Sequence, residues 1–136
     1  MNPGKVQSQI TFLYYDDLEP IDKFYRQIMG FELVEDQEWA KIYAVSESGF
    51  VGIVDGAHGF HKPQAKNAVL VTLVVDDVFG WYDYLKGQGV KMLKEVQEHE
   101  AIQVRCFFCQ DPGGYSIEVQ QFLNPEVARI FHQGEA

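Results

Sequence analysis

Positive charge is scarce in this sequence. Its 136 residues include 11 Lys and Arg side chains against 20 Asp and Glu, which gives a formal net charge of -9 at pH 7. An excess of negative charge repels nucleic acid and anionic membrane surfaces, and it favours solubility or a cationic small ligand. We therefore expect a small-molecule ligand, with no nucleic-acid partner and no membrane partner.

Long apolar runs and cysteines are scarce as well. The longest apolar stretch, Ala68 to Val75, is interrupted by Thr72 and is far too short to cross a bilayer. The opening residues, MNPGKVQSQI, lack the apolar run of a secretory signal. The two cysteines, Cys106 and Cys109, lie three residues apart on an expected strand, so they point to opposite faces and cannot form a disulfide framework. These absences predict a cytoplasmic protein with reduced thiols.

The sequence does contain enough apolar residues, 46%, for one compact domain over residues 1–136. Strand-like alternation over residues 9–15 is followed by a helical stripe over residues 18–29. Asp17 suits the N-cap of this helix, and Gly30 suits the left-handed position that ends it. Three further strand-like runs follow, at residues 31–35, 39–45 and 50–54. The first half therefore reads as a βαβββ module.

The second half repeats this order. A shift of 60 residues places Leu13 on Leu73 and Asp17 on Asp77. The expected elements are a strand at 70–75, a helix at 78–89, and strands at 91–96, 102–110 and 115–120. The sequence thus predicts an α+β fold of two tandem modules, at about residues 9–55 and 68–122, with a linker at 56–67 and a short C-terminal helix at 124–132. A ferredoxin-like βαββαβ sandwich is the alternative, but it has only two strands between its helices.

Three segments resemble the vicinal oxygen chelate superfamily, which includes glyoxalases, bleomycin-resistance proteins and extradiol dioxygenases. They are DDLEPIDKFYRQIMGFELV, VDDVFGWYDYLKGQGVKML and FFCQDPGGYSIEV. The resemblance covers about residues 9–122, as one domain of that superfamily. It implies that the two modules form a U-shaped, curved mixed sheet in a homodimer, with a small-molecule ligand on the concave side.

The resemblance also implies where a divalent metal would bind. Members of the family hold it by His or Gln early in the first strand of each module and by a carboxylate late in the last strand. These positions correspond here to Ile10, Gly52, Leu70 and Glu118, and only Glu118 has a donor side chain. The nitrogen donors elsewhere, which we expect to be exposed loop side chains, are His58, His61 and His99. We therefore expect no metal cofactor, although a divalent ion held by other donors stays an alternative.

Strand alternation predicts which side chains line the concave face. The expected ligand-binding residues are Phe12, Tyr14, Trp39, Tyr43, Leu70, Arg105, Phe107 and Glu118. The opposite faces, with Leu13, Leu73, Val104, Cys106 and Phe108, are expected to pack under the helices. Arg105 and Glu118 are of special interest, because Glu118 suits a base or hydrogen-bond acceptor and Arg105 suits an anionic or carbonyl group. The alternative is a structural salt bridge between the two.

Three functions compete on this evidence. The first is a metal-independent protein, similar to the bleomycin-resistance group, that binds a small aromatic or cationic molecule in an aromatic cleft. The second is an enzyme, either a metal-dependent lyase, isomerase or dioxygenase of the glyoxalase-like type or an acid/base catalyst that uses Glu118 with Tyr14 or Tyr43. The third is an accessory interaction domain, for which the C-terminal stripe Val127, Ile130 and Phe131 is the support.

Overall fold

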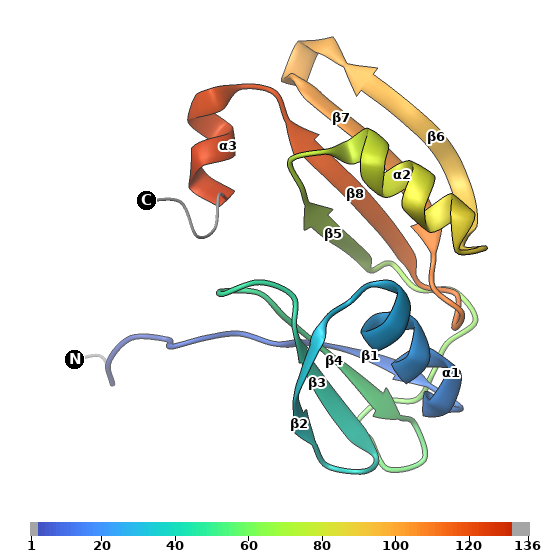
Figure 1. The fold of residues 1–136 in the computed structure, drawn as a ribbon. Helices are drawn as coiled ribbons and strands as arrows, with labels where there is room; N and C mark the ends of the chain where they lie inside the picture. Colours follow the sequence, from blue (N-terminus) through green and yellow to red (C-terminus); the bar gives the residue numbers. More distant parts are fainter. Residues whose placement is uncertain (1–2, 132–136) are drawn as a thin grey trace. The chain divides into compact units, whose positions relative to one another are not determined.

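The computed structural model describes residues 3–131 of the chain (Figure 1). The chain divides into two compact units, the first ending at Gln64 and the second beginning at Ala65. Each unit contains one four-stranded mixed sheet with a helix packed on one face. Within the described residues, no helix is long and apolar enough to span a membrane.

The first unit has the order βαβββ. Its elements are β1 (Thr11–Tyr15), α1 (Leu18–Lys23), η1 (Phe24–Ile28), β2 (Glu32–Asp36), β3 (Ala40–Ala44) and β4 (Phe50–Asp55). The strands lie in the order β1-β4-β3-β2, with β1 parallel to β4 and the other pairs antiparallel. Side chains on one face of this sheet, including Leu13 and Ile53, are fully buried and form the core of the unit.

The helix of the first unit begins where the sequence predicts it. The Asp17 side chain accepts a hydrogen bond from the Glu19 backbone N–H at 3.2 Å, which caps the free N–H groups of the first turn. After Lys23 the helix widens into the π-helical turn η1, in which the Met29 N–H donates to the Phe24 carbonyl at 2.9 Å. The adjacent side chains Phe24 and Tyr25, the first two residues of this turn, are both buried. The sequence predicted the extent of the helix and missed the π-helical turn.

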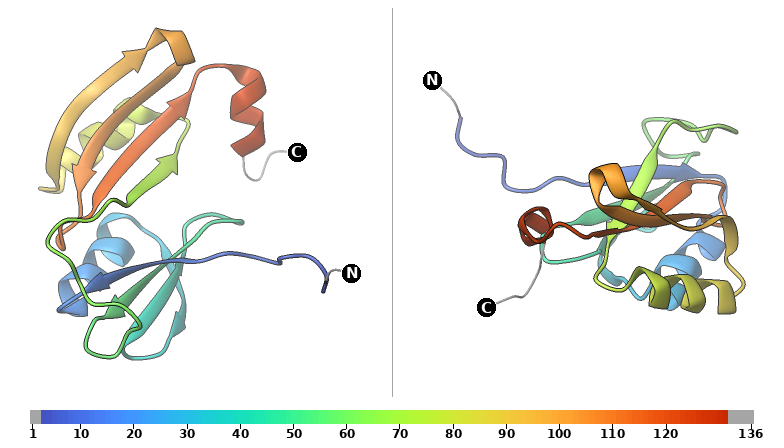
Figure 2. Two further views of the ribbon diagram at one scale, coloured as in Figure 1. Left: turned by 180° about the vertical axis from the view of Figure 1, so that it is seen from behind. Right: turned by 90° about the horizontal axis from the view of Figure 1, so that it is seen from above.

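The second unit repeats the order. Its elements are β5 (Leu70–Val74), α2 (Val78–Gly87), β6 (Lys91–His99), η2 (Glu100–Ile102), β7 (Val104–Gln110), β8 (Ser116–Phe122) and α3 (Pro125–Phe131). The strands lie in the order β5-β8-β7-β6, and α2 lies across one face of the sheet (Figures 1 and 2). The predicted α+β class and the repeated βαβββ order are confirmed. The strand β6 is longer than expected, and residue 132 of the expected terminal helix lies outside the described residues.

The hairpin between β7 and β8 fixes how these two strands pair. Asp111 is buried, and its Oδ1 accepts hydrogen bonds from the N–H groups of Gly113 at 3.0 Å and Tyr115 at 2.8 Å. Gly114 has φ +98°, a backbone conformation that glycine adopts without strain. This loop places Gln110 directly opposite Ser116, and it thereby sets the register of every residue pair along the two strands.

Candidate functional site

Glu118 lies on β8, on the face of the second sheet that is opposite α2. Thr72 of β5 is its direct neighbour in the parallel pair, and the Thr72 hydroxyl donates to Glu118 Oε1 at 3.0 Å. The Gln120 amide donates to Oε2 at 3.4 Å. The carboxylate is half-buried and its two oxygens are oriented by different neighbours. It is therefore a preorganised acceptor on this sheet face.

Cys106 lies on the same face as Glu118, across the strand pair from Gln120. Burial raises the pKa of the Cys106 thiol to about 11, with a further contribution from its hydrogen bond to Glu118. Cys109 lies on the opposite face, paired with Ile117, and burial together with the Asp111 charge raises its pKa to about 11 as well. Both thiols are protonated at neutral pH. Cys106 can donate to Glu118, but it is not an activated nucleophile.

The prediction that Arg105 and Phe107 share a face with Glu118 is wrong. Phe107 is fully buried on the α2 side, where the edge of its ring meets the Tyr82 ring at a centroid separation of 5.2 Å. Arg105 Nε donates to Glu98 Oε1 at 2.9 Å. The Arg105 guanidinium also lies 5.6 Å from the centroid of the Phe79 ring on α2.

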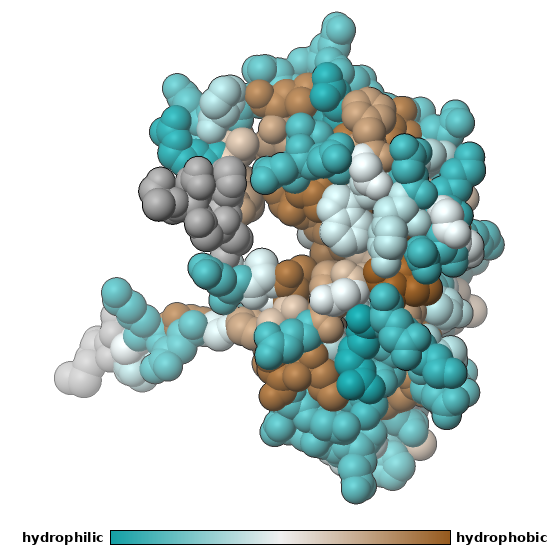
Figure 3. Space-filling model, viewed as in Figure 1, coloured by the Kyte–Doolittle hydropathy of each residue, from teal (hydrophilic) through white to brown (hydrophobic). Residues whose placement is uncertain are grey.

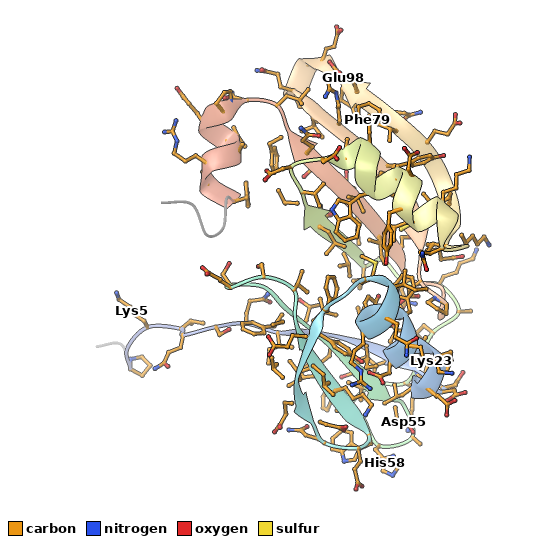
Figure 4. All side chains as sticks on the ribbon, in the orientation of Figure 1. Lys5, Lys23, Asp55, His58, Phe79 and Glu98 are labelled. Atoms are coloured by element: carbon orange, nitrogen blue, oxygen red, sulfur yellow. The ribbon has the colours of Figure 1, made fainter. Side chains whose placement is uncertain are left out.

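Glu98 of β6 and Phe79 of α2 are both labelled in Figure 4, at the end of the second unit where Arg105 contacts them. The expected pair between Arg105 and Glu118 is therefore replaced by a salt bridge on the opposite face. The residue that does face Glu118 from β7 is Phe108, which lies directly opposite it in the strand pair. The prediction that Phe108 packs under the helix is therefore wrong.

In the first unit, Phe12 and Gly52 occupy the corresponding pair of positions. They are direct neighbours in the parallel pair of β1 and β4, as Thr72 and Glu118 are in the pair of β5 and β8. A Cβ atom on Gly52 would clash with the Phe12 ring. The Phe12 ring thus fills the space that a side chain at position 52 would need.

Tyr14 lies on the same face of the first sheet as Phe12. Its ring makes an edge contact with His61, with 5.5 Å between centroids. His58 instead stacks on Trp39, with 6.1 Å between centroids. Trp39 is 42% exposed and precedes β3. The two linker histidines therefore contact different aromatic rings and are both exposed.

Tyr43 does not line the sheet face that carries Phe12, and that expectation is wrong. It is fully buried on the α1 side, where its hydroxyl donates to Asp22 Oδ1 at 2.6 Å. Burial and this hydrogen bond raise the pKa of Tyr43 above its ordinary range. Burial opposes the ionisation of Asp22, but hydrogen bonds from Arg26 and Tyr43 outweigh it, so the pKa of Asp22 is lowered. Tyr43 is a structural residue in this arrangement.

The residues at the four expected metal positions do not fit a divalent ion. Ile10 lies two residues before Phe12, and Leu70 lies two residues before Thr72. Neither side chain has a donor atom. Gly52 has no side chain, and Glu118 alone contributes oxygen. Within residues 3–131, no group of three or more His, Cys, Asp or Glu side chains is arranged to hold a metal. A divalent ion needs several donors brought together in advance.

The hollow that the structure shows in the second unit is separate from Glu118. Its volume is about 350 Å³, and it is lined by Asp77, Gly80, Trp81 and Tyr84. Asp77 caps α2 and the other three belong to it, at the spacing of a single helix face. The helix packs on the sheet face opposite Glu118, so this hollow is not part of the site built from the sheet.

Comparisons with known proteins give a consistent result. A sequence model described as "Glyoxalase/Bleomycin resistance protein/Dioxygenase superfamily" matches residues 7–119. A probable lactoylglutathione lyase of Vibrio parahaemolyticus serotype O3:K6 is 28% identical over 122 residues, which cover 82% of this chain and 87% of the relative.

Solved structures share the fold. A lactoylglutathione lyase from Agrobacterium tumefaciens has a TM-score of 0.69 at 19% identity, covering 88% of this chain and 96% of its own. A glyoxalase/bleomycin resistance protein/dioxygenase from Nocardioides has a TM-score of 0.73 at 14% identity, covering 99% of this chain and 91% of its own. At such low identity these two likenesses concern the fold alone.

Proposed function

Because the chain belongs to the glyoxalase/bleomycin resistance protein/dioxygenase superfamily, we propose that it binds a small aromatic or cationic molecule without a metal. The observation that carries this proposal is the donor set. Three of the four expected metal positions hold Ile10, Gly52 and Leu70, and the Phe12 ring fills the space beside Gly52. Glu118, the remaining donor, is hydrogen-bonded to Thr72.

Exposed apolar side chains on the sheets support the choice of ligand. The Phe12 side chain is 38% exposed and the Leu70 side chain 48% exposed. Each lies on the face of its sheet that does not form the core. Small-molecule sites are mostly apolar with a few oriented polar groups, and Glu118 is such a group. On the first sheet, Tyr14 shares the face of Phe12 and offers a further aromatic contact, and the acidic net charge attracts a cation.

An enzyme is the second candidate, and the name of the Vibrio parahaemolyticus relative favours it. In a metal-free version, Glu118 would act as general base or acid. In a metal-dependent version, a lyase, isomerase or dioxygenase would need donors besides Glu118. Both enzyme versions predict turnover of a substrate, which the binding-protein proposal does not. The second version also predicts dependence on a metal.

The test is ligand binding before and after treatment with a chelator. Benzylamine, an aromatic cation, is titrated into the full chain and followed by NMR. We expect equal affinity in untreated and EDTA-treated protein, and weaker binding by Glu118→Gln. Binding that appears only after a divalent ion is added, or turnover in a lactoylglutathione lyase assay, would replace this proposal with the enzyme.

We also propose that the protein acts as a cytoplasmic homodimer. Resemblance to the family supports the dimer, and exposed apolar side chains such as Val6 (89%) and Ile130 (72%) support self-association. Light scattering on the purified chain tests it, because a dimer has twice the 15.6 kDa of one chain. A mass of one chain at micromolar concentration would contradict the dimer.

A further inference from the structure

We propose that a row of side chains across the second sheet binds an aromatic zwitterion, a molecule whose flat ring carries a cationic group at one end and an anionic group at the other. The row consists of Lys94 on β6, Phe108 on β7, Glu118 on β8 and Thr72 on β5, and we call it the Lys94–Glu118 row. This inference rests on the proposed function and specifies the ligand of the same site.

Strand register places these four side chains on one face. Lys94 pairs with Phe108, Phe108 pairs with Glu118, and Glu118 pairs with Thr72. Directly opposite residues on neighbouring strands project from the same face of a sheet. The contacts agree with the register: Lys94 Nζ lies 5.8 Å from the centroid of the Phe108 ring, and Thr72 donates to Glu118. Helix α2 packs on the other face, against Phe107.

The two charged side chains of the row, Lys94 and Glu118, do not form an ion pair with each other. Within residues 3–131 the side-chain ion pairs are those of Arg26, Lys41 and Arg105, and none of them includes Lys94 or Glu118. Phe108 lies between Lys94 and Glu118 in the strand register, and the Lys94 ammonium lies over its ring. An ammonium and a carboxylate on either side of an aromatic residue therefore face the same side, and both are accessible to a ligand.

The dimensions of the row define the ligand. Neighbouring strands are about 4.8 Å apart, so the backbones at Lys94 and Glu118 are separated by roughly 10 Å. One benzene ring with a short charged group at each end spans such a distance. Its ring would stack on the half-buried Phe108, its anionic group would pair with Lys94, and its ammonium group would donate to Glu118.

The same face is bordered by the terminal helix. Phe122 follows Glu118 on β8 by four residues, so alternation places its side chain on the same face. Phe131 of α3 stacks on Phe122, with centroids 4.9 Å apart and ring planes 12° apart. An aromatic stack therefore flanks the Lys94–Glu118 row along β8, and it extends the apolar surface available to the ring of a ligand.

The experiment compares three probes on the full chain by NMR titration: 4-(aminomethyl)benzoate, benzylamine and benzoate. The first carries both charges on one ring, and the other two carry one each. We expect 4-(aminomethyl)benzoate to bind about tenfold more tightly than either, because it gains a charge-assisted hydrogen bond at the second end. Lys94→Met should reduce its affinity to that of benzylamine, and Glu118→Gln to that of benzoate.

Matched variants distinguish binding at this row from a general effect of surface charge on the affinities. Lys86→Met removes a lysine from α2, where its ammonium lies over the Tyr82 ring, and it should leave all three affinities unchanged. Lys94→Arg should retain most of the advantage of the zwitterion, since the cation is kept. Circular dichroism of each variant confirms that it is folded before its affinities are compared.

Three results would overturn the inference. Equal affinity for 4-(aminomethyl)benzoate and benzylamine would show that the second charge has no partner. An unchanged affinity in Lys94→Met would show that the ligand lies elsewhere. In both cases, binding of benzylamine would leave the proposed function standing. If none of the three probes binds, the proposed function fails together with this inference.

Discussion

The Cys106 thiol and the Glu118 carboxylate share a hydrogen bond on the second sheet, and each affects the chemistry of the other. The negative charge of Glu118 disfavours the thiolate, in addition to the larger effect of burial, so the pKa of Cys106 is raised to about 11. The protonated thiol in turn can donate to Glu118, beside the donors Thr72 and Gln120. The arrangement thus gives the Glu118 carboxylate three neighbouring donors that orient it, with an unreactive thiol beside it.

This coupling predicts slow alkylation of Cys106. With a pKa of about 11, only about one thiol in a thousand is ionised at pH 8, and the buried side chain limits access further. Glu118→Gln should lower the pKa and raise the alkylation rate of Cys106 several-fold. Mass spectrometry of iodoacetamide-treated protein measures both cysteines in one peptide.

Cys109 is the internal control for that experiment. It lies on the opposite face, paired with Ile117, and its raised pKa comes from burial and from Asp111. Its rate should not change in Glu118→Gln. Native Cys106 that reacts as fast as a free cysteine, or a variant in which both rates rise equally, would show that Glu118 does not control this thiol.

Between elements, the hydrogen bond from Tyr43 to Asp22 joins β3 to α1. Tyr43→Phe removes the hydroxyl and leaves the half-buried carboxylate of Asp22 with one donor fewer. We expect the free energy of unfolding to fall by about 1–2 kcal/mol, since a hydrogen bond to a charged group is lost. Urea denaturation at pH 7 measures this change. Tyr82→Phe is the matched control, because the ring of Tyr82 contacts Phe107 and should keep that contact.

The difference in free energy of unfolding between wild type and Tyr43→Phe should change with pH in a definite direction. The pKa of Asp22 is lower in the folded protein than its ordinary value, so its contribution to stability is complete above the ordinary Asp range near pH 4. The contribution is lost as pH falls through the lowered pKa. The gap between wild type and Tyr43→Phe should therefore be constant from pH 5 to 7 and shrink at lower pH. A gap that does not change with pH would contradict a role for ionised Asp22.

The order of the elements could be predicted from the sequence. For some strands, the face of the sheet on which a given side chain lies could not. In β3, Ala40 and Ile42 look like core residues and Tyr43 looks like a ligand contact. Tyr43 is nevertheless fully buried, with its hydroxyl bonded to Asp22, whereas Ile42 is only half-buried. Hydrophobicity along one strand does not reveal a partner that comes from a distant helix.

In β7 both faces are apolar, so alternation alone could not distinguish Phe107 from Phe108. The pairing set by the Asp111 hairpin decides it, since Phe108 is opposite Glu118. Counting outward from that turn would have given the correct face. The same count would have placed Arg105 opposite Gln121 on the α2 side, away from Glu118.

At the scale of the whole molecule, the two modules keep the same topology and differ in their chemistry. The strand register makes Gly52 and Glu118 equivalent positions, next to Phe12 and Thr72 respectively. The first module thus has an aromatic ring where the second has a hydrogen-bonded carboxylate. Much of the surface visible in Figure 3 is hydrophilic, in keeping with the net charge of -9. Family membership therefore fixes the scaffold, and the side chains at these positions decide the chemistry.

The most direct test of metal-independent binding is the metal content of the full chain purified without chelator, measured together with its melting temperature in the presence of divalent ions. We predict less than about one-tenth of an equivalent of any divalent metal, and no increase in melting temperature with Zn²⁺, Ni²⁺, Mn²⁺ or Mg²⁺, since a bound ion would stabilise the folded state by mass action. One equivalent of metal, with a clear stabilisation by the same ion, would contradict the proposal.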